Sequence, residues 1–217
     1  MSWKDTTLGE VVSVKHGWAL KRQHFESEGP FVLVTPGNFN EEGGLKLRPE
    51  KDRSYSGEFA PEYLLDQNDL IIAMTEQAPG LLGSSAMIPE PNRFLHNQRI
   101  GLVKLKDASR TSCKYLYYLF NTSPVRGQIY GSATGTKVRH TAPERIYRVS
   151  VSMPDLPTQE RIAAILSAYD DLIENNRRRI ALLEQAARLL YREWFVHFRF
   201  PGHETAKFAD GLPEGWA

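Results

Sequence analysis

One long segment near the C-terminal end, residues 157–197, has the apolar spacing of a helix that packs against another helix. Its apolar or neutral residues recur in alternating steps of three and four, which is the pattern of a coiled-coil seam. The seam residues are Ile173, Asn176, Ile180, Leu183, Ala187, Leu190 and Trp194. A helix of this length reaches roughly 60 Å, more than the diameter of a small domain. We therefore expect part of the seam to extend beyond its own globular domain and to need a partner.

Two features inside this helix leave alternatives open. Asn176 is polar at a seam position, so it either fixes the register of a helix pair or marks where the seam ends or bends. The three arginines at 177–179 form either a solvated face, ion-paired with Glu174 and Glu184, or a contact to phosphates.

The composition limits the classes of protein that fit. The chain has 217 residues, 41% of them hydrophobic, which is enough for one core plus an appendage. A formal net charge of +1 does not indicate a globally basic nucleic-acid binder, so any such charge must be local. The single cysteine, Cys113, excludes an internal disulfide framework and a cysteine zinc site. Because the sequence shows neither a signal peptide nor an apolar run long enough for a membrane, we expect a soluble cytoplasmic protein.

The order of patterns along the chain predicts an α+β fold. Short strand-like runs separated by Gly- and Pro-containing turns fill residues 1–154, with a mostly antiparallel or mixed sheet. The runs are 10–15, 31–35, 69–74, 85–88, 100–105 and 146–152. Helices are expected from about 113, capped by Thr111 or Ser112, and after Ser123. We expect a globular mixed-sheet domain at 1–154, one long coiled-coil helix at 155–200, and a polar, loosely held tail at 201–217.

None of the common catalytic or metal-binding motifs is complete in this sequence. The run Gly131–Lys137 resembles a phosphate loop, but Thr136 separates the second glycine from the lysine. The six histidines form no metal-binding pair at close spacing. The carboxylates of Asp170, Asp171 and Glu174 precede arginines at helical spacing, which favours a solvated ion-paired face. We therefore expect no catalytic residue, no metal and no cofactor in this chain.

A basic stretch at 126–148 is the strongest candidate for a nucleic-acid contact. Five cations face one carboxylate there: Arg126, Lys137, Arg139, Arg145 and Arg148 against Glu144. A small-residue basic loop can place amides and hydroxyls on phosphates while a few side chains reach base edges. The candidate residues are Thr134, Thr136, Lys137, Arg139 and His140. The alternative is an ordinary solvated loop.

Four further polar sets carry side chains that can read bases. Gln and Asn contact adenine bidentately, and Arg or Lys contacts guanine. The same residue types are also common in turns, which is the competing interpretation. The candidates are Lys21, Arg22 and Gln23; Thr35, Asn38 and Asn40; Thr75 and Gln77; and Gln98 and Arg99.

The long helix also carries a family signal. LPTQERIA at 156–163, DDLIENNR at 170–177 and EWFVHFRFPG at 193–202 resemble the conserved region of type I restriction–modification specificity (S) subunits. Upstream, LGEV at 8–11, NDLIIAMT at 68–75 and HNQRIGLVKL at 96–105 are similar in order to a target-recognition domain. LPEGW at 212–216 is similar to the sequence that opens a second such domain.

The resemblance implies a DNA-recognition subunit without a catalytic centre. In that family two recognition domains are each followed by a long helix, and the antiparallel helices separate two DNA half-sites. Methyltransferase subunits using S-adenosylmethionine dock on the scaffold, and restriction subunits cut DNA with ATP. One recognition domain and one helix are present here, so the chain is either part of a full subunit or a natural half-subunit.

The leading hypothesis is therefore sequence-specific recognition of duplex DNA by residues 1–154, with the seam joining a second copy or a second half. The competing hypothesis is a coiled-coil interaction protein whose globular head binds another protein.

Overall fold

The computed structural model describes residues 3–77 and 79–216. They fall into two compact units, residues 1–164 and 165–217.

An antiparallel sheet of four strands forms the centre of the first unit. Its order is β2 (Val12–His16), β11 (Ile100–Leu105), β7 (Leu70–Ala73) and β9 (Ser85–Met87). All four residues of β7 are buried, which explains its uninterrupted apolar sequence. Leu70 and Ile72 contribute to one hydrophobic cluster, and Ile71 and Ala73 to another, as the alternation of a strand requires.

A second sheet of five strands packs over the first. Its order is β3 (Phe25–Glu26), β5 (Ser54–Tyr55), β4 (Phe31–Val34), β10 (Phe94–His96) and β6 (Leu64–Leu65). Only the β10–β4 pair is parallel among the described strands. This arrangement confirms the predicted α+β fold with a mostly antiparallel, mixed sheet. Val34, Ile71 and Phe94 share the buried cluster that the two sheets enclose.

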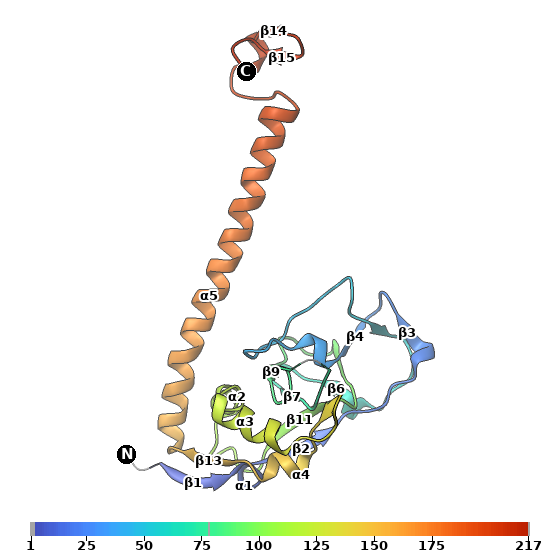
Figure 1. Cartoon of the computed structure of the whole chain (residues 1–217), viewed down its shortest axis with the longest axis vertical. Coiled ribbons are helices and arrows are strands. Elements are labelled where there is room, and N and C mark those ends of the chain that lie inside the picture. The colour runs from blue at the N-terminus through green and yellow to red at the C-terminus, as the bar shows by residue number, and fades with distance from the viewer. Residues whose placement is uncertain (1–2, 78, 217) are drawn as a thin grey trace. The chain divides into compact units, whose positions relative to one another are not determined.

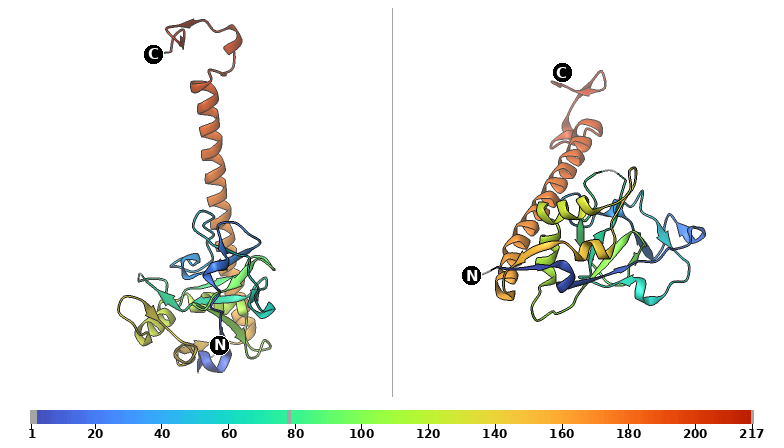
Figure 2. Two further views of the ribbon diagram at one scale, coloured as in Figure 1. Left: turned by 90° about the vertical axis from the view of Figure 1, so that its right-hand side faces the viewer. Right: turned by 60° about the horizontal axis from the view of Figure 1, so that its bottom comes forward.

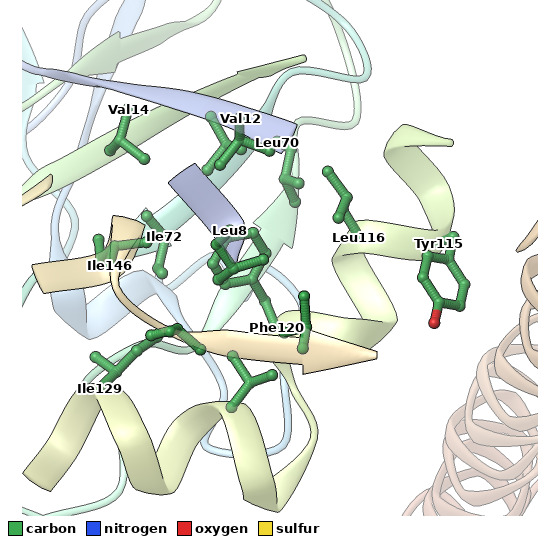
Figure 3. Packing of buried hydrophobic residues seen from close by; sticks show 14 of the residues in the cluster. Leu8, Val12, Val14, Leu70, Ile72, Tyr115, Leu116, Phe120, Ile129 and Ile146 are labelled. Carbon is green, nitrogen blue, oxygen red and sulfur yellow. The ribbon is translucent and has the colours of Figure 1, made fainter. Parts of the chain in front are cut away.

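Short helices cover the other face of the four-stranded sheet (Figure 1). They are α1 (Leu8–Val11), α2 (Cys113–Phe120), α3 (Ser123–Ser132) and α4 (Pro143–Tyr147). The Ser112 hydroxyl caps α2 by accepting the Tyr115 N–H at 3.3 Å, as the sequence predicts. Figure 3 shows Leu116, Phe120 and Ile129 pointing from α2 and α3 into the cluster that Leu8 and Ile146 complete.

Two pairs of short strands complete the first unit. Strand β1 (Lys4–Thr7) pairs antiparallel with β13 (Ser150–Met153). Strand β8 (Thr75–Glu76) pairs antiparallel with β12 (Arg139–His140).

The predicted strands differ from the observed ones at two places. Glu10 and Val11 belong to α1, and Ile146 and Tyr147 belong to α4, although both segments alternate like strands. Leu8 and Ile146 are fully buried between these helices and the sheet. Tertiary burial of single apolar side chains therefore overrides the local alternation.

The long helix α5 spans Leu156–Tyr191 and continues as a π-helical turn over Arg192–Val196. Its 36 residues correspond to roughly 54 Å of length. No helix within the described ranges has both the length and the apolar character needed to span a membrane.

The first turns of the long helix belong to the first unit (Figure 2). One buried amide, that of Gln159, fixes them there. The Gln159 Oε1 accepts the Ser112 N–H at 3.0 Å, and Nε2 donates to the carbonyls of Arg110 at 3.1 Å and Pro154 at 2.9 Å. Ala163 and Ile162 add apolar contacts to the same core. The start of the helix is therefore part of the globular core.

The C-terminal tail contains a short hairpin that the sequence did not predict. Strands β14 (Phe208–Ala209) and β15 (Leu212–Pro213) form a small hairpin. The Trp216 ring lies 4.8 Å from the Phe200 ring and 5.1 Å from the Phe195 ring. Aromatic contacts thus hold the tail to the last turns of the helix within the second unit.

Replacement of the buried amide tests this anchor. We expect Gln159→Leu to lower the free energy of unfolding by about 2–5 kcal/mol, because three backbone groups lose their partner in a buried site. Urea unfolding followed by circular dichroism measures the loss. Glu160→Gln, at the exposed neighbouring position, is the matched control. An equal stability of the two variants would contradict the assignment.

Candidate polar surface

A short hairpin carries most of the candidate residues of the basic stretch. The Thr134 N–H donates to the His140 carbonyl at 3.0 Å, and the His140 N–H donates to the Thr134 carbonyl at 2.8 Å. Gly135 has φ +98°, and a Cβ there would lie 2.0 Å from the Val138 carbonyl oxygen. Glycine is therefore required at the turn. Thr136 and Lys137 are exposed at its tip.

The hairpin lies beside a segment that is about 60 residues earlier in the sequence. In the β8–β12 pair, His140 is opposite Thr75 and Arg139 is opposite Glu76. The Thr75 Oγ1 and the His140 Nδ1 are 3.3 Å apart. The exposed Gln77 directly follows this pair, so two of the predicted sets belong to one surface.

A third segment, which contains Gln98 and Arg99, is connected to the hairpin through the backbone of Met74. The Met74 N–H donates to the Arg99 carbonyl at 3.0 Å, and the Met74 carbonyl accepts the Thr141 N–H at 3.0 Å. Gln98 and Arg99 are exposed next to this row. We define the polar surface as Gln77, Gln98, Arg99, Thr134, Thr136, Lys137, Arg139 and His140.

An exposed tryptophan borders the polar surface, and the sequence analysis did not identify it. The Trp18 N–H donates to the His96 carbonyl at 2.9 Å, and the Trp18 carbonyl accepts the Gln98 N–H at 3.1 Å. Trp18 is 37% exposed, and its ring stacks on the Tyr63 ring at a centroid distance of 5.5 Å. A Cβ on Gly17 would lie 2.2 Å from the Asn97 carbonyl oxygen. In the sequence, the feature that could have identified Trp18 is the Gly-Trp pair directly after strand β2.

The set Lys21, Arg22 and Gln23 lies close to Trp18 in the chain. All three are exposed, and Arg22 begins a short 3₁₀ turn. The Leu20 N–H donates to the Trp18 carbonyl at 3.0 Å, which ties this turn to the border of the polar surface.

The residues of the set Thr35, Asn38 and Asn40 hydrogen-bond within the protein. Asn38 is 1% exposed, and its Oδ1 accepts the Thr35 N–H and hydroxyl, both at 2.9 Å. Its Nδ2 donates to Asp52 Oδ1 at 2.8 Å. We therefore assign Asn38 and Thr35 to a turn that their side chains stabilise. Asn40 is half-buried, and its carbonyl accepts the Ser84 hydroxyl at 2.6 Å.

Several guanidinium groups of the basic stretch bind the protein's own backbone. Arg139 lies 4.0 Å above the Tyr130 ring and donates to the Tyr130 carbonyl at 3.2 Å. Arg145 donates to the Ser132 carbonyl, and Arg126 donates to three carbonyls. Of the two cations of the hairpin, Lys137 is therefore the one better placed for an external phosphate.

A buried histidine lies beneath the border of the surface. His96 is 0% exposed, and its Nε2 donates to the Ile100 carbonyl at 2.9 Å. Burial lowers the pKa of His96 to about 4. The imidazole is therefore neutral at physiological pH, and its hydrogen bond to Ile100 closes the turn that carries Asn97 and Gln98.

The second unit exposes the seam of α5. Ile173, Ile180, Leu183 and Leu190 are all exposed, with Leu183 at 68%. Asn176 and Ala187 are exposed as well, and Trp194 is half-buried. Leu166 and Tyr169 extend the same three-four spacing toward the start of the helix and are also exposed. A long apolar stripe of this kind is unusual unless a partner covers it.

Comparison with known proteins gives a consistent family. The sequence profile described as "Type I restriction modification DNA specificity domain" matches residues 1–185. The "Type I restriction enzyme MjaIX specificity subunit" of Methanocaldococcus jannaschii is 30% identical over 149 residues, covering 67% of this chain and 33% of that protein.

Two solved structures share the fold. The S subunit of a type I restriction–modification system from M. genitalium has a TM-score of 0.64 at 17% identity, covering 90% of this chain and 46% of that one. The HsdS subunit from Thermoanaerobacter tengcongensis has a TM-score of 0.54 at 19% identity, covering 100% and 53%. The chain thus spans about a third of the curated relative and about half of each solved chain.

The buried histidine predicts a specific pH dependence of stability. The pKa is about 4 in the folded protein and 6.5 in the unfolded chain, so stability is complete above pH 6.5 and falls as the pH drops toward 4. We expect this one group to contribute a loss of about 3 kcal/mol over that range. The test is to measure the free energy of unfolding between pH 4 and pH 6.5 for the wild type and for His96→Gln. Equal pH slopes for the two proteins would refute the assignment.

Proposed function

The chain belongs to the type I restriction–modification DNA specificity family, and from that premise we propose that its first unit reads one short half-site in duplex DNA. The observation that carries the proposal is the convergence of three separate segments on the polar surface. Their exposed side chains are an amide pair, Gln77 and Gln98, and the cations Arg99 and Lys137. Amides and cations supply both base contacts and phosphate contacts.

The proposed role of this chain is recognition, with chemistry left to other subunits. Methyltransferase subunits supply the S-adenosylmethionine site, and restriction subunits supply the ATP site. The family match favours this role over a head domain that binds another protein. As such an enzyme acts on host DNA, we place the protein in the cytoplasm.

The exposed seam of α5 is the surface through which a second recognition unit joins the first. One unit that reads one half-site needs a second unit for a bipartite target. The seam residues of α5 pair with a second copy of this chain or with a second half, and the helix then sets the distance between the half-sites. Because the helix is about 54 Å long, it is long enough to separate two sites by about one and a half turns of DNA.

The exposed lysine of the hairpin gives the first test. We expect Lys137→Ala to weaken binding of the full chain to any duplex and to reduce the slope of log affinity against log salt by about one, as one phosphate contact is lost. Fluorescence anisotropy over a salt series measures both quantities. Arg139→Ala is expected to change the slope less, because its guanidinium is bound to Tyr130.

Lys114→Ala is the matched control, since that lysine is exposed on α2 away from the polar surface. An unchanged affinity and slope in Lys137→Ala would remove the hairpin from the DNA interface.

Sedimentation equilibrium tests the seam. We expect the wild-type chain to self-associate and Ile180→Lys to shift it toward monomer, because a charge in the seam is buried on pairing. Leu182→Lys places the same charge at an equally exposed apolar position off the seam, and it should associate like wild type. A wild-type chain that stays monomeric at the highest concentration contradicts pairing of two copies.

A further inference from the structure

The buried carboxylate of Glu76, the residue before Gln77, binds the backbone of the Gly80–Leu82 loop. Glu76 is 3% exposed, and its Oε2 accepts three consecutive backbone N–H groups. The distances are 3.1 Å from Gly80, 3.0 Å from Leu81 and 2.8 Å from Leu82. One oxygen thus fixes three residues of the Gly80–Leu82 loop.

A guanidinium holds the same loop from its carbonyl side. The Arg126 Nε donates to the Leu82 carbonyl at 2.9 Å, and one Nη donates to the Gly80 carbonyl. The other Nη donates to the Glu41 carbonyl at 2.8 Å, which ties the loop to the turn that follows Asn40. Gly80 has φ +115° and Gly83 has φ +79°, so the loop takes a backbone path that other residues rarely adopt.

Removing the charged groups of Glu76 and Arg126 from water costs free energy, so their burial is an inefficient way to stabilise the fold. Burial lowers the pKa of the Arg126 guanidinium, and the nearby charges of Glu76 and Glu41 act in the opposite direction. Buried charged groups are often replaced by apolar residues without loss of stability. Glu76 and Arg126 make six hydrogen bonds to backbone groups, which an apolar pair cannot make. Five of them bind the loop and determine its shape, and the sixth binds the Glu41 carbonyl.

We propose that Glu76 and Arg126 are positioning residues that fix Gln77 in the conformation in which it reads an adenine. Glu76 lies in β8, where Arg139 of the hairpin is its partner, so the residue that directly precedes Gln77 is held both by the strand pairing and by its own bonds to the loop. An amide that is already oriented loses less conformational entropy on binding a base. The inference rests on the proposed DNA recognition and names residues that act through Gln77.

The test uses the full chain and a duplex that the wild-type protein selects from a random library. Its preference for that duplex over a scrambled one of the same length is measured at low ionic strength. We expect Arg126→Lys, Glu76→Ala and Gln77→Ala each to reduce the preference about tenfold, the size of one lost base contact. Affinity for the scrambled duplex and the salt slope should stay as in wild type, which a general loss of fold would not allow.

Two further measurements separate positioning from a structural role. Hydrogen exchange of the Gly80, Leu81 and Leu82 amides should become faster in Arg126→Lys and Glu76→Ala. Combining Arg126→Lys with Gln77→Ala should cost no more preference than Gln77→Ala alone, because both act on one contact. Arg110→Lys, an exposed arginine elsewhere in the first unit, is the control and should behave like wild type.

The outcomes are distinguishable. A wild-type chain that selects no motif contradicts the proposed function itself. An unchanged preference in a folded variant whose loop amides have lost protection overturns the inference and leaves DNA recognition intact. Unchanged exchange in both variants would show that the two side chains do not fix the loop, and additive losses in the double variant would show that Arg126 does not act through Gln77. If Glu76→Ala does not fold, Arg126→Lys decides, since it keeps a positive charge at this position of α3.

Discussion

The backbone of Met74 is the constraint on which the polar surface depends. Its N–H extends the ladder between β7 and β11 by bonding the Arg99 carbonyl, and its own carbonyl begins the pairing with the hairpin through Thr141. One residue at the end of a buried strand thus brings together three polar segments. The strand beneath them is buried on both faces, so the segments are held by the rigid centre of the unit.

Four charged side chains near the polar surface bind backbone groups of neighbouring segments. Glu76 and Arg126 bind the two sides of one loop, and Arg139 and Arg145 donate to backbone carbonyls of α3. The near-neutral chain therefore offers few free cations on the polar surface. Such a surface is suited to specific contacts at fixed positions, because strong unspecific attraction to phosphates needs many exposed cations.

The sequence predicted the features that depend on local periodicity. The apolar runs of β7 and β11, the Ser112 cap of α2 and the long helix α5 are all visible in spacing and residue type. The convergence of the polar segments was not predictable, since β8 and β12 have two residues each and their register depends on tertiary contacts. For the same reason Asn38 looked like a base-reading amide, although Thr35 and Asp52 occupy its hydrogen-bonding groups.

The central claim is that this chain selects the DNA sequence on which a methyltransferase acts. The most direct measurement is single-molecule mapping of methylated bases in cells that co-express the chain with a methyltransferase subunit of a type I system. The account predicts one defined methylated motif that requires this chain and becomes degenerate at a single position in Gln77→Ala. Methylation that is absent, or that keeps the same motif without this chain, would contradict it.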